Sequence, residues 1–307
     1  MFGAISYPPI PIWDIGPIAF SLHGLFAALG FLAGALLASR ELRKRGYDVV
    51  KYQSALTWGL VGALLGARYL TAPAAIMTAI DEGTSILATL NPISGNFSIL
   101  GGFLGGIVAG TWRMKQVGLS IWPTLDMSSF GLALGTIVGR IGDLAIVEHL
   151  GRVTDVAWGY GIKPGYVLAP QHTSLQCADT VNLVDGFCPY PGEVGVAGVY
   201  HHVAAYDMIG AIILLGVLYL VRSRFRLHYG QLFFLWVAWY GLQRFVLDFL
   251  RFGMGDAEIG SFTWNQISGL VAGIGGLVAV WVMGRKQPIV SVDEDTLRGA
   301  VLESASA

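Results

Sequence analysis

Charged residues are scarce in this 307-residue chain, and their scarcity excludes most classes of soluble protein. Asp, Glu, Lys and Arg make up 13% of the sequence, against about 25% in a typical soluble domain. Basic and acidic residues nearly balance, at 19 and 20, so no positive excess indicates a nucleic-acid surface. Hydrophobic residues reach 54%, which excludes a disordered chain and an ordinary soluble fold. The composition therefore predicts an integral membrane protein that crosses the bilayer several times.

Cysteine is almost absent, with only Cys177 and Cys188. Neither belongs to a Cys-x-x-Cys pair or to a histidine spacing typical of zinc, so we expect no metal site and no cysteine nucleophile. Both lie in residues 148–201, a segment that the topology below places outside, where disulfides can form. The sequence is compatible with one disulfide or with two free thiols.

Long apolar runs predict an all-α fold with about seven transmembrane helices, because a helix needs about 20 apolar residues to cross the hydrocarbon core. The predicted spans are residues 18–39, 52–71, 97–114, 123–147, 202–221, 231–249 and 264–283. Residues 72–90 form either a surface helix or a poor eighth span. Residues 1–286 are expected to be one polytopic membrane domain, followed by a tail, 287–307.

The basic residues orient these spans. If the spans alternate, 13 of the 19 lysines and arginines lie on one side, which the positive-inside rule makes the cytoplasm. The N-terminus then faces out, the tail is cytoplasmic, and residues 148–201 form an outer-face loop region between spans four and five. The first 39 residues contain no lysine or arginine, so we expect a retained first span rather than a signal peptide. The expected location is the cell (cytoplasmic) membrane.

Six basic residues oppose this rule, because they fall in outer halves of spans or in outer loops. They are Arg68, Arg140, Arg152, Lys163, Arg244 and Arg251. Ion pairing between spans is one explanation. An anionic ligand in the outer leaflet is the other, and it is favoured because ionisable residues inside membranes are usually functional.

The end of span four concentrates such residues. Arg140 lies between Gly139 and Gly142, Asp143 follows directly, and Glu148 and Gly151 come after it. If the helix continued, all four would share one broad face. Helix packing explains the glycines but does not explain the arginine.

The outer end of span six carries a second group. Arg244, Asp248 and Arg251 are spaced i, i+4, i+7 and would form one stripe with a net positive charge. A guanidinium binds phosphate through two hydrogen bonds and is always charged. A salt bridge within the helix is the alternative.

Histidines and a tyrosine form the third group. His202 and Tyr206 would share a helix face, whereas His201 and Asp207 would point elsewhere. Any of them could anchor span five at the interface. His23 in span one could be a base, but a lone histidine on an apolar helix more often bonds to a neighbouring helix.

These groups fit three functions: an enzyme acting on an anionic phospholipid, an anion transporter, or a structural membrane subunit. Transporters usually contain two related halves with interrupted helices. Residues 1–150 and 151–307 show no convincing repeat, which disfavours a transporter.

The ordered motifs from about residue 13 to 285 resemble the prolipoprotein diacylglyceryl transferase family. They are His23-Gly24, Gly66-Ala67-Arg68-Tyr69, Phe97-Ser98-Ile99-Leu100-Gly101-Gly102, Gly139-Arg140-Ile141-Gly142-Asp143 with Glu148 and Gly151-Arg152, His201 with Tyr206-Asp207, and Arg244 with Asp248-Phe249-Leu250-Arg251. The Gly-Arg-x-Gly stretch followed by Glu and Gly-Arg is the most specific.

The resemblance implies transfer of the diacylglyceryl group of phosphatidylglycerol to the lipobox cysteine of a prolipoprotein, with release of glycerol phosphate and without a cofactor. The substrates are then a membrane lipid and a lipobox peptide. Arg140 would contact the lipid head group and Arg244 would hold the departing phosphate. Further site residues implied are Glu148, Asp143, Gly151, His201, Tyr206, Asp248, Arg251 and Arg68.

The sequence departs from the family around the acceptor. The family histidine of Ser-Phe-His-Gly-Gly is Leu100, so thiol deprotonation needs another base, and His23 stands where the family has tyrosine. Asp143 replaces an asparagine, and Val147 replaces the glycine before Glu148. These changes leave open a transferase with a different acceptor, an inactive structural paralogue, or an anion or lipid transporter.

The topology makes one prediction, since it rests on the distribution of basic residues. A reporter enzyme fused after Lys286 should read cytoplasmic, and one inserted within residues 151–201 should read external. A cytoplasmic signal from the second fusion would overturn the orientation and the outer-leaflet site together.

Overall fold

The computed structural model describes residues 5–15, 18–69, 72–81, 83, 85, 99–168, 198–251, 258–259 and 261–287. Its contacts divide the chain into two compact units. The first comprises Met1–Ala38 and Ser128–Val290, and the second comprises Ser39–Met127 and Ser291–Ala307. Each unit is described by itself. Cys177 and Cys188 lie outside the described residues.

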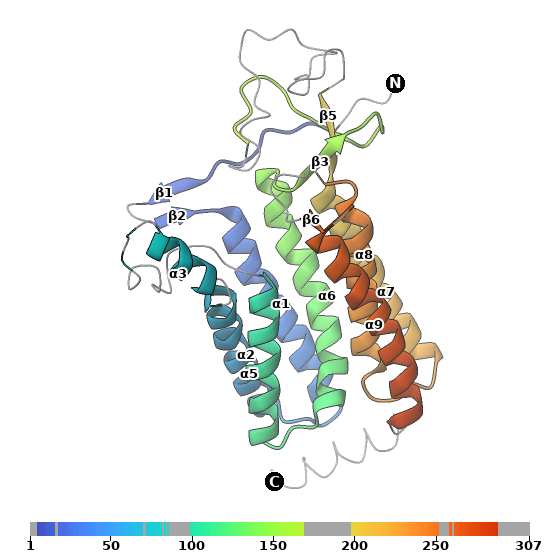
Figure 1. The fold of residues 1–307 in the computed structure, drawn as a ribbon. Coiled ribbons are helices and arrows are strands. Elements are labelled where there is room, and N and C mark those ends of the chain that lie inside the picture. Colours follow the sequence, from blue (N-terminus) through green and yellow to red (C-terminus); the bar gives the residue numbers. More distant parts are fainter. Residues whose placement is uncertain are drawn as a thin grey trace. The chain divides into compact units, whose positions relative to one another are not determined.

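Helices dominate both units, as predicted (Figure 1). Those with residues in the first unit are α1 (Leu22–Arg43), α6 (Ile121–Ile146), α7 (Val203–Arg224), α8 (Gln231–Asp248) and α9 (Trp264–Lys286). The second contains α2 (Val49–Tyr69), α3 (Ala72–Asp81) and α5 (Ile99–Gln116). The chain passes from one unit to the other within α1 and α6.

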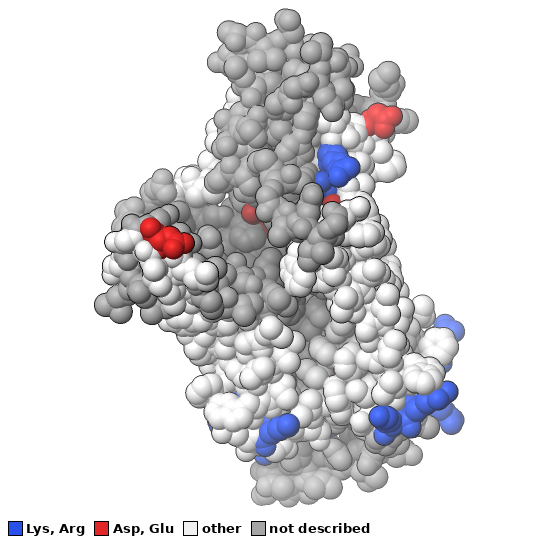
Figure 2. Space-filling model, in the orientation of Figure 1, with Lys and Arg blue, Asp and Glu red and all other residues white. Residues whose placement is uncertain are grey.

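Four helices are long and apolar enough to cross a membrane: α1, α6, α7 and α9. The other three predicted spans are also helices, α2, α5 and α8. Large apolar side chains point away from the protein, with Leu36 62% and Val271 67% exposed, as expected of surfaces that face lipid. Most of the described surface visible in Figure 2 carries no charged side chain. The chain is a multi-pass membrane protein.

Residues 72–81 of the segment 72–90 form one short helix. Helix α3 has 10 residues, which span about 15 Å and cannot cross the hydrocarbon core. This length favours the surface-helix alternative for residues 72–81.

Glycines bring helix backbones into contact. A Cβ on Gly34 of α1 would lie 2.5 Å from the carbonyl oxygen of Gly131 on α6, and one on Gly30 would lie 2.5 Å from that of Gly135. No larger residue fits at such a crossing, which is the role of small residues in membrane helix pairs. The predicted use of glycine for close helix packing is thus confirmed.

A small antiparallel sheet adds to the expected all-α fold. Strands β3 (Leu150–Val153), β5 (Val199–His202) and β4 (Tyr160–Gly161) pair in the order β3-β5-β4. Part of the predicted outer loop region is therefore ordered. Two hairpins complete the strands: β1 (Trp13–Ile15) with β2 (Ile18–Phe20), and β6 (Glu258–Ile259) with β7 (Phe262–Thr263).

The N-terminal segment ties this sheet to the end of α6. Tyr7 donates its hydroxyl hydrogen to the Leu144 carbonyl at 2.7 Å, and the Ile10 amide donates to the Ala145 carbonyl at 2.8 Å. Carbonyls in the last turn of a helix lack partners within the helix, so these bonds satisfy them. They also hold the end of α6, from which the candidate site is built.

Candidate active site

The end of α6 is a Schellman turn rather than a continuing helix. The Glu148 amide donates to the Asp143 carbonyl at 2.8 Å and the Val147 amide to the Leu144 carbonyl at 3.2 Å, the two bonds that define this motif. Val147 has φ +56° and His149 has φ +61°. The helix ends close to the predicted limit of span four, and the left-handed residues redirect the chain into β3. The condition under which Glu148 and Gly151 would share a helix face with Arg140 is therefore not met.

This turn explains one departure from the family pattern. The position before Glu148 needs a left-handed backbone, which glycine adopts without strain. Val147 adopts it at a cost of about 1–2 kcal/mol, while its side chain is fully buried among Leu150, Tyr160 and Tyr200. Burial of this side chain offsets the strain and keeps Glu148 turned back toward Asp143.

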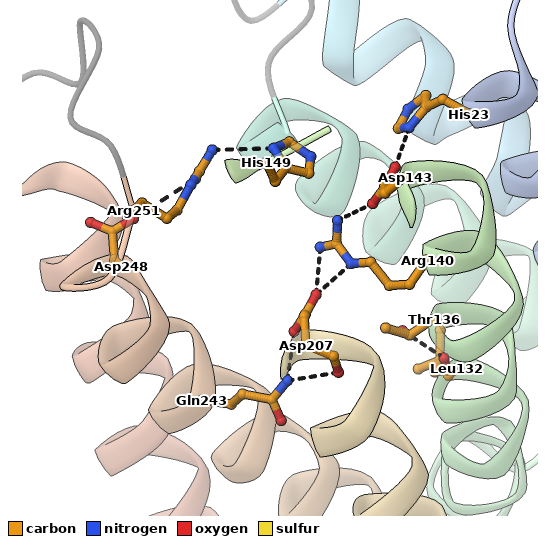
Figure 3. Close-up of polar contacts among 10 residues, drawn as sticks. All are labelled: His23, Leu132, Thr136, Arg140, Asp143, His149, Asp207, Gln243, Asp248 and Arg251. Carbon is orange, nitrogen blue, oxygen red and sulfur yellow. Dashed lines mark hydrogen bonds and ion pairs between the residues drawn. The ribbon is translucent and has the colours of Figure 1, made fainter. Parts of the chain in front are cut away.

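His23 meets two carboxylates at this turn, of which Figure 3 shows that of Asp143. Its Nδ1 lies 2.5 Å from Asp143 Oδ1 and 3.1 Å from Glu148 Oε2. Gly142 makes the contact possible, because a Cβ there would lie 2.6 Å from the Leu22 carbonyl oxygen and would push α1 away. The His23 side chain is 47% exposed, whereas that of Asp143 is 3% exposed. The imidazole is therefore held on its Nδ1 side and open elsewhere.

Arg140 is held between two carboxylates. It pairs with Asp143 on its own helix, and its Nε and Nη2 each lie 2.5 Å from Asp207 Oδ2 on α7. The predicted shared face of Arg140 and Asp143 is confirmed. Asp207 points elsewhere than Tyr206, as predicted: it meets Arg140, whereas Tyr206 lies against His201. The pairing of Asp207 with Arg140 was not predicted.

A small pocket lies beside this pair. Its lining comprises Arg140, His149, Val203, Ala204, Asp207, Arg244, Leu247 and Arg251. Three arginines face a single aspartate, so the pocket is positive. An anionic group is the ligand that this arrangement favours.

The three arginines differ in their partners. Arg140 has two carboxylates, and Arg251 Nη1 lies 3.8 Å from Asp248 Oδ1. Within the described residues, the Arg244 guanidinium has no ion pair or hydrogen bond. Arg244 and Arg251 both line the pocket, as the predicted stripe required, although Arg251 lies beyond the end of α8.

Asp248 and Gly151 support this end of the pocket. Asp248 accepts a hydrogen bond of 2.5 Å from Thr263 Oγ1, the residue that caps α9. Gly151 pairs with Arg251, and a Cβ on it would overlap the Leu250 carbonyl oxygen. Only glycine lets β3 pack this closely on the end of α8.

The histidines of β5 lie in other contacts. The predicted shared face of His202 and Tyr206 is wrong, because α7 begins at Val203 and helical spacing does not apply to His202. Instead, His201 Nδ1 lies 3.0 Å from the Tyr206 hydroxyl, and His202 Nε2 lies 3.0 Å from that of Tyr7. None of these side chains lines the pocket.

Two predicted residues are not placed at this site. Arg68 is buried on α2 in the other unit, and its contact with a lipid head group stays a prediction. The side chain of Leu100 lies outside the described residues.

The sequence reasoning missed His149 and Gln243. His149 lines the pocket, and its Nδ1 lies 3.5 Å from Arg251 Nη2. Gln243 donates from Nε2 to Asp207 Oδ1 at 2.5 Å. An amide within an apolar span, one residue before Arg244, was a signal that could have identified Gln243.

His23, Asp143 and Glu148 could also hold a metal ion, since each offers a ligand atom within 4.8 Å of the others. However, Arg140 already binds the second oxygen of Asp143. Its positive charge opposes a cation at this position. The residues fit an ion pair better than a metal site.

Comparison with known proteins identifies one family. The family model described as prolipoprotein diacylglyceryl transferase matches residues 11–282. Three relatives are named phosphatidylglycerol–prolipoprotein diacylglyceryl transferase. That of Thermus thermophilus is 30% identical over 76% of this chain and 81% of its own length. That of Stenotrophomonas maltophilia is 29% identical over 90% and 94%, and that of Frankia alni is 25% identical over 98% and 73%.

The pH dependence of stability should reveal the state of His149. Burial lowers the pKa of His149 to about 4, against 6.5 for a free imidazole. Between these values the unfolded chain binds a proton and the folded chain does not, so acidification destabilises the fold. The loss from this residue should reach about 2 kcal/mol between pH 7 and pH 5.

The measurement is thermal unfolding in detergent across this pH range. His149→Asn should show a smaller loss, because asparagine tolerates the left-handed backbone and does not titrate. The matched control His228→Asn should retain the loss seen in the wild type. Identical pH profiles for the wild type and His149→Asn would contradict the buried neutral imidazole.

Proposed function

The chain belongs to the prolipoprotein diacylglyceryl transferase family, and we propose that it transfers the diacylglyceryl group of phosphatidylglycerol to the lipobox cysteine of a prolipoprotein. The observation that carries this proposal is Arg244, a guanidinium without a carboxylate partner among the described residues, in a pocket lined by two further arginines. Such a cation is costly in a membrane helix unless an anion binds it. The phosphate of the lipid is that anion.

The donor binds through its phosphate. Arg244 and Arg251 contact the phosphate oxygens, and Arg140 contacts the head group from the opposite side of the pocket. The thiolate sulfur attacks the glycerol carbon that carries the phosphate, so a carbon–sulfur bond forms and the carbon–oxygen bond breaks. Glycerol phosphate leaves with the electron pair, and the arginines stabilise its charge in a water-poor site. Asp248 and Gly151 support the arginine side of this pocket.

His23 is the base in this mechanism. Its Nδ1 faces Asp143 and Glu148, so Nε2 is left to accept the proton of the lipobox thiol. A carboxylate fixes the tautomer and stabilises the imidazolium that forms. The proton then passes to the departing glycerol phosphate, which returns His23 to its neutral form. His201 and Tyr206 contribute to binding the peptide.

Two departures from the family pattern support this assignment. His23 replaces a tyrosine and Asp143 replaces an asparagine, and their side chains are in contact. The two changes together form a histidine–carboxylate pair. The pair supplies the base that the leucine at position 100 cannot.

The proposed setting is the cell membrane. Seven spans, an external N-terminus and a cytoplasmic tail at 287–307 place the pocket toward the outer leaflet, within one polytopic domain, 1–286. Phosphatidylglycerol and the lipobox of an exported prolipoprotein meet at that depth.

A second candidate is a transferase that uses the same lipid with a different acceptor. Leu100 favours it, because the departures from the family cluster around the acceptor rather than the donor. The deciding experiment is mass spectrometry of a lipobox peptide incubated with the purified protein and phosphatidylglycerol. A diacylglyceryl mass increase on cysteine supports the proposed function. Consumption of the lipid without a modified peptide supports the second candidate.

The donor site makes the next prediction. Arg140→Ala and Arg244→Ala should each lower transfer by at least about a hundredfold, because the developing phosphate charge loses a donor. Lysine at either position should restore activity only in part, since its ammonium group cannot bind phosphate through two parallel hydrogen bonds as a planar guanidinium does. Glycerol phosphate release from labelled lipid gives the rates, and size-exclusion profiles verify folding. Full activity in either alanine variant would remove that arginine from the mechanism.

The assignment of His23 as the base leads to a separate prediction. His23→Ala should reduce kcat about a hundredfold or more, as expected for loss of a general base, with little change in the KM for the lipid. Leu100→His should then restore part of the rate. Unchanged kcat in His23→Ala would eliminate His23 as the base.

A further inference from the structure

The side chain of Gln243 links α8 to the centre of the site. Its Nε2 donates to Asp207 Oδ1 at 2.5 Å and to the Asp207 backbone carbonyl at 3.1 Å. Asp207 is buried near the start of α7. One amide thus holds both the carboxylate and the backbone of the residue that pairs with Arg140 (Figure 3).

The orientation of this amide follows from its other neighbour. Trp239 Nε1 lies 2.8 Å from Gln243 Oε1, and an indole nitrogen can only donate a hydrogen bond. The oxygen of the amide must therefore face Trp239, and the NH₂ group must face Asp207. The two hydrogen bonds therefore require the same orientation of the Gln243 amide.

Gly210 provides the space in which the amide lies. A Cβ built on Gly210 would overlap Oε1 of Gln243. Gly210 is one turn after Asp207 on α7, so the bare backbone there lets the amide pass across the helix. An alanine at 210 would displace the flexible end of Gln243 and leave the helix backbone intact.

The amide determines which oxygen of Asp207 is available to Arg140. Gln243 occupies Oδ1, and the Arg140 Nε and Nη2 both contact Oδ2. A carboxylate of aspartate otherwise rotates over a broad range about χ2. Because the amide is neutral, it restricts this rotation without changing the charge of the pocket.

We propose that Gln243 is a positioning residue for transfer: it fixes the Asp207 carboxylate, which fixes the Arg140 guanidinium, which in turn orients Asp143 toward His23. The inference rests on the proposed function for its kinetic readout. Arg244 and Arg251 hold the donor phosphate without help from Gln243. The two ends of the site therefore respond differently to its loss.

The first test is Gln243→Leu, which keeps the size of the side chain and removes its hydrogen bonds. We expect kcat to fall on the order of tenfold, as for a misplaced catalytic group. The KM for phosphatidylglycerol should rise by a smaller factor, because Arg140 contacts the head group while Arg244 and Arg251 keep their contacts with the phosphate. Gly210→Ala should lower kcat in the same way, although Gln243 itself is unchanged.

Gln231→Leu is the matched control. Gln231 lies on the same helix and donates to the Val280 carbonyl at 3.0 Å, far along α8 from the site. Its loss should lower the Tm and leave kcat unchanged. A purely structural role for Gln243 would give the same result as this control.

Gln243→Glu provides a readout that packing cannot produce. Two carboxylates at this spacing cannot both be ionised, so they share a proton. We expect the activity of this variant to rise relative to the wild type as the pH falls from 8 to 6. The charged and titratable groups around the pair are Arg140, Asp143, His149, Arg244 and Arg251.

A spectroscopic measurement separates this inference from the proposed function. In protein labelled with ¹⁵N-arginine, the Nε–H signal of Arg140, identified by its loss in Arg140→Lys, should exchange slowly with solvent. Gln243→Leu should accelerate this exchange. If the wild type shows no transfer but the exchange changes, the proposed function fails and the positioning stands. Wild-type kcat in Gln243→Leu and Gly210→Ala, or unchanged exchange, would overturn the inference.

Discussion

A guanidinium inside an apolar helix bundle must be neutralised, and the structure around the site depends on how Arg140 meets this requirement. Asp143 neutralises it from the same helix and Asp207 from α7. Each carboxylate has a further partner, His23 on α1 for Asp143 and Gln243 on α8 for Asp207. One cation, with 20% of its side chain exposed, thereby fixes the relative positions of side chains from four helices.

The backbone supports this network at the points where helices meet or end. Gly142 lets the start of α1 approach α6, and the Schellman turn at Val147 returns Glu148 to His23. The N-terminal segment satisfies the last carbonyls of α6 through Tyr7 and Ile10. The polar groups of the site are thus held by backbone contacts that do not take part in the proposed chemistry.

The arginines of the pocket serve different purposes because their partners differ. Arg140 is committed to two carboxylates, whereas Arg244 has none among the described residues. A fully neutralised arginine holds its neighbours in place, and one without a counter-ion attracts an anion. In the proposed mechanism, phosphate binding therefore depends mainly on the α8 side, and activation of the acceptor thiol depends mainly on the α1 side.

Composition and residue types determined that the chain is a helical membrane protein, and the motifs identified its family and the residues Arg140, Asp143, Arg244 and Arg251. These properties follow from local features: the length of apolar runs, the residue types, and the i, i+3 spacing of Arg140 and Asp143 within one helix. Predictions from helical spacing were wrong where the helices end. Glu148 and His202 lie beyond helix boundaries, so their directions depend on backbone turns that no periodicity encodes. The pairing of Asp207 with Arg140, the role of Gln243 and the contact of His23 with Asp143 were decided only by tertiary structure, because the partners come from different helices, and the geometry of helix packing selects which polar groups meet.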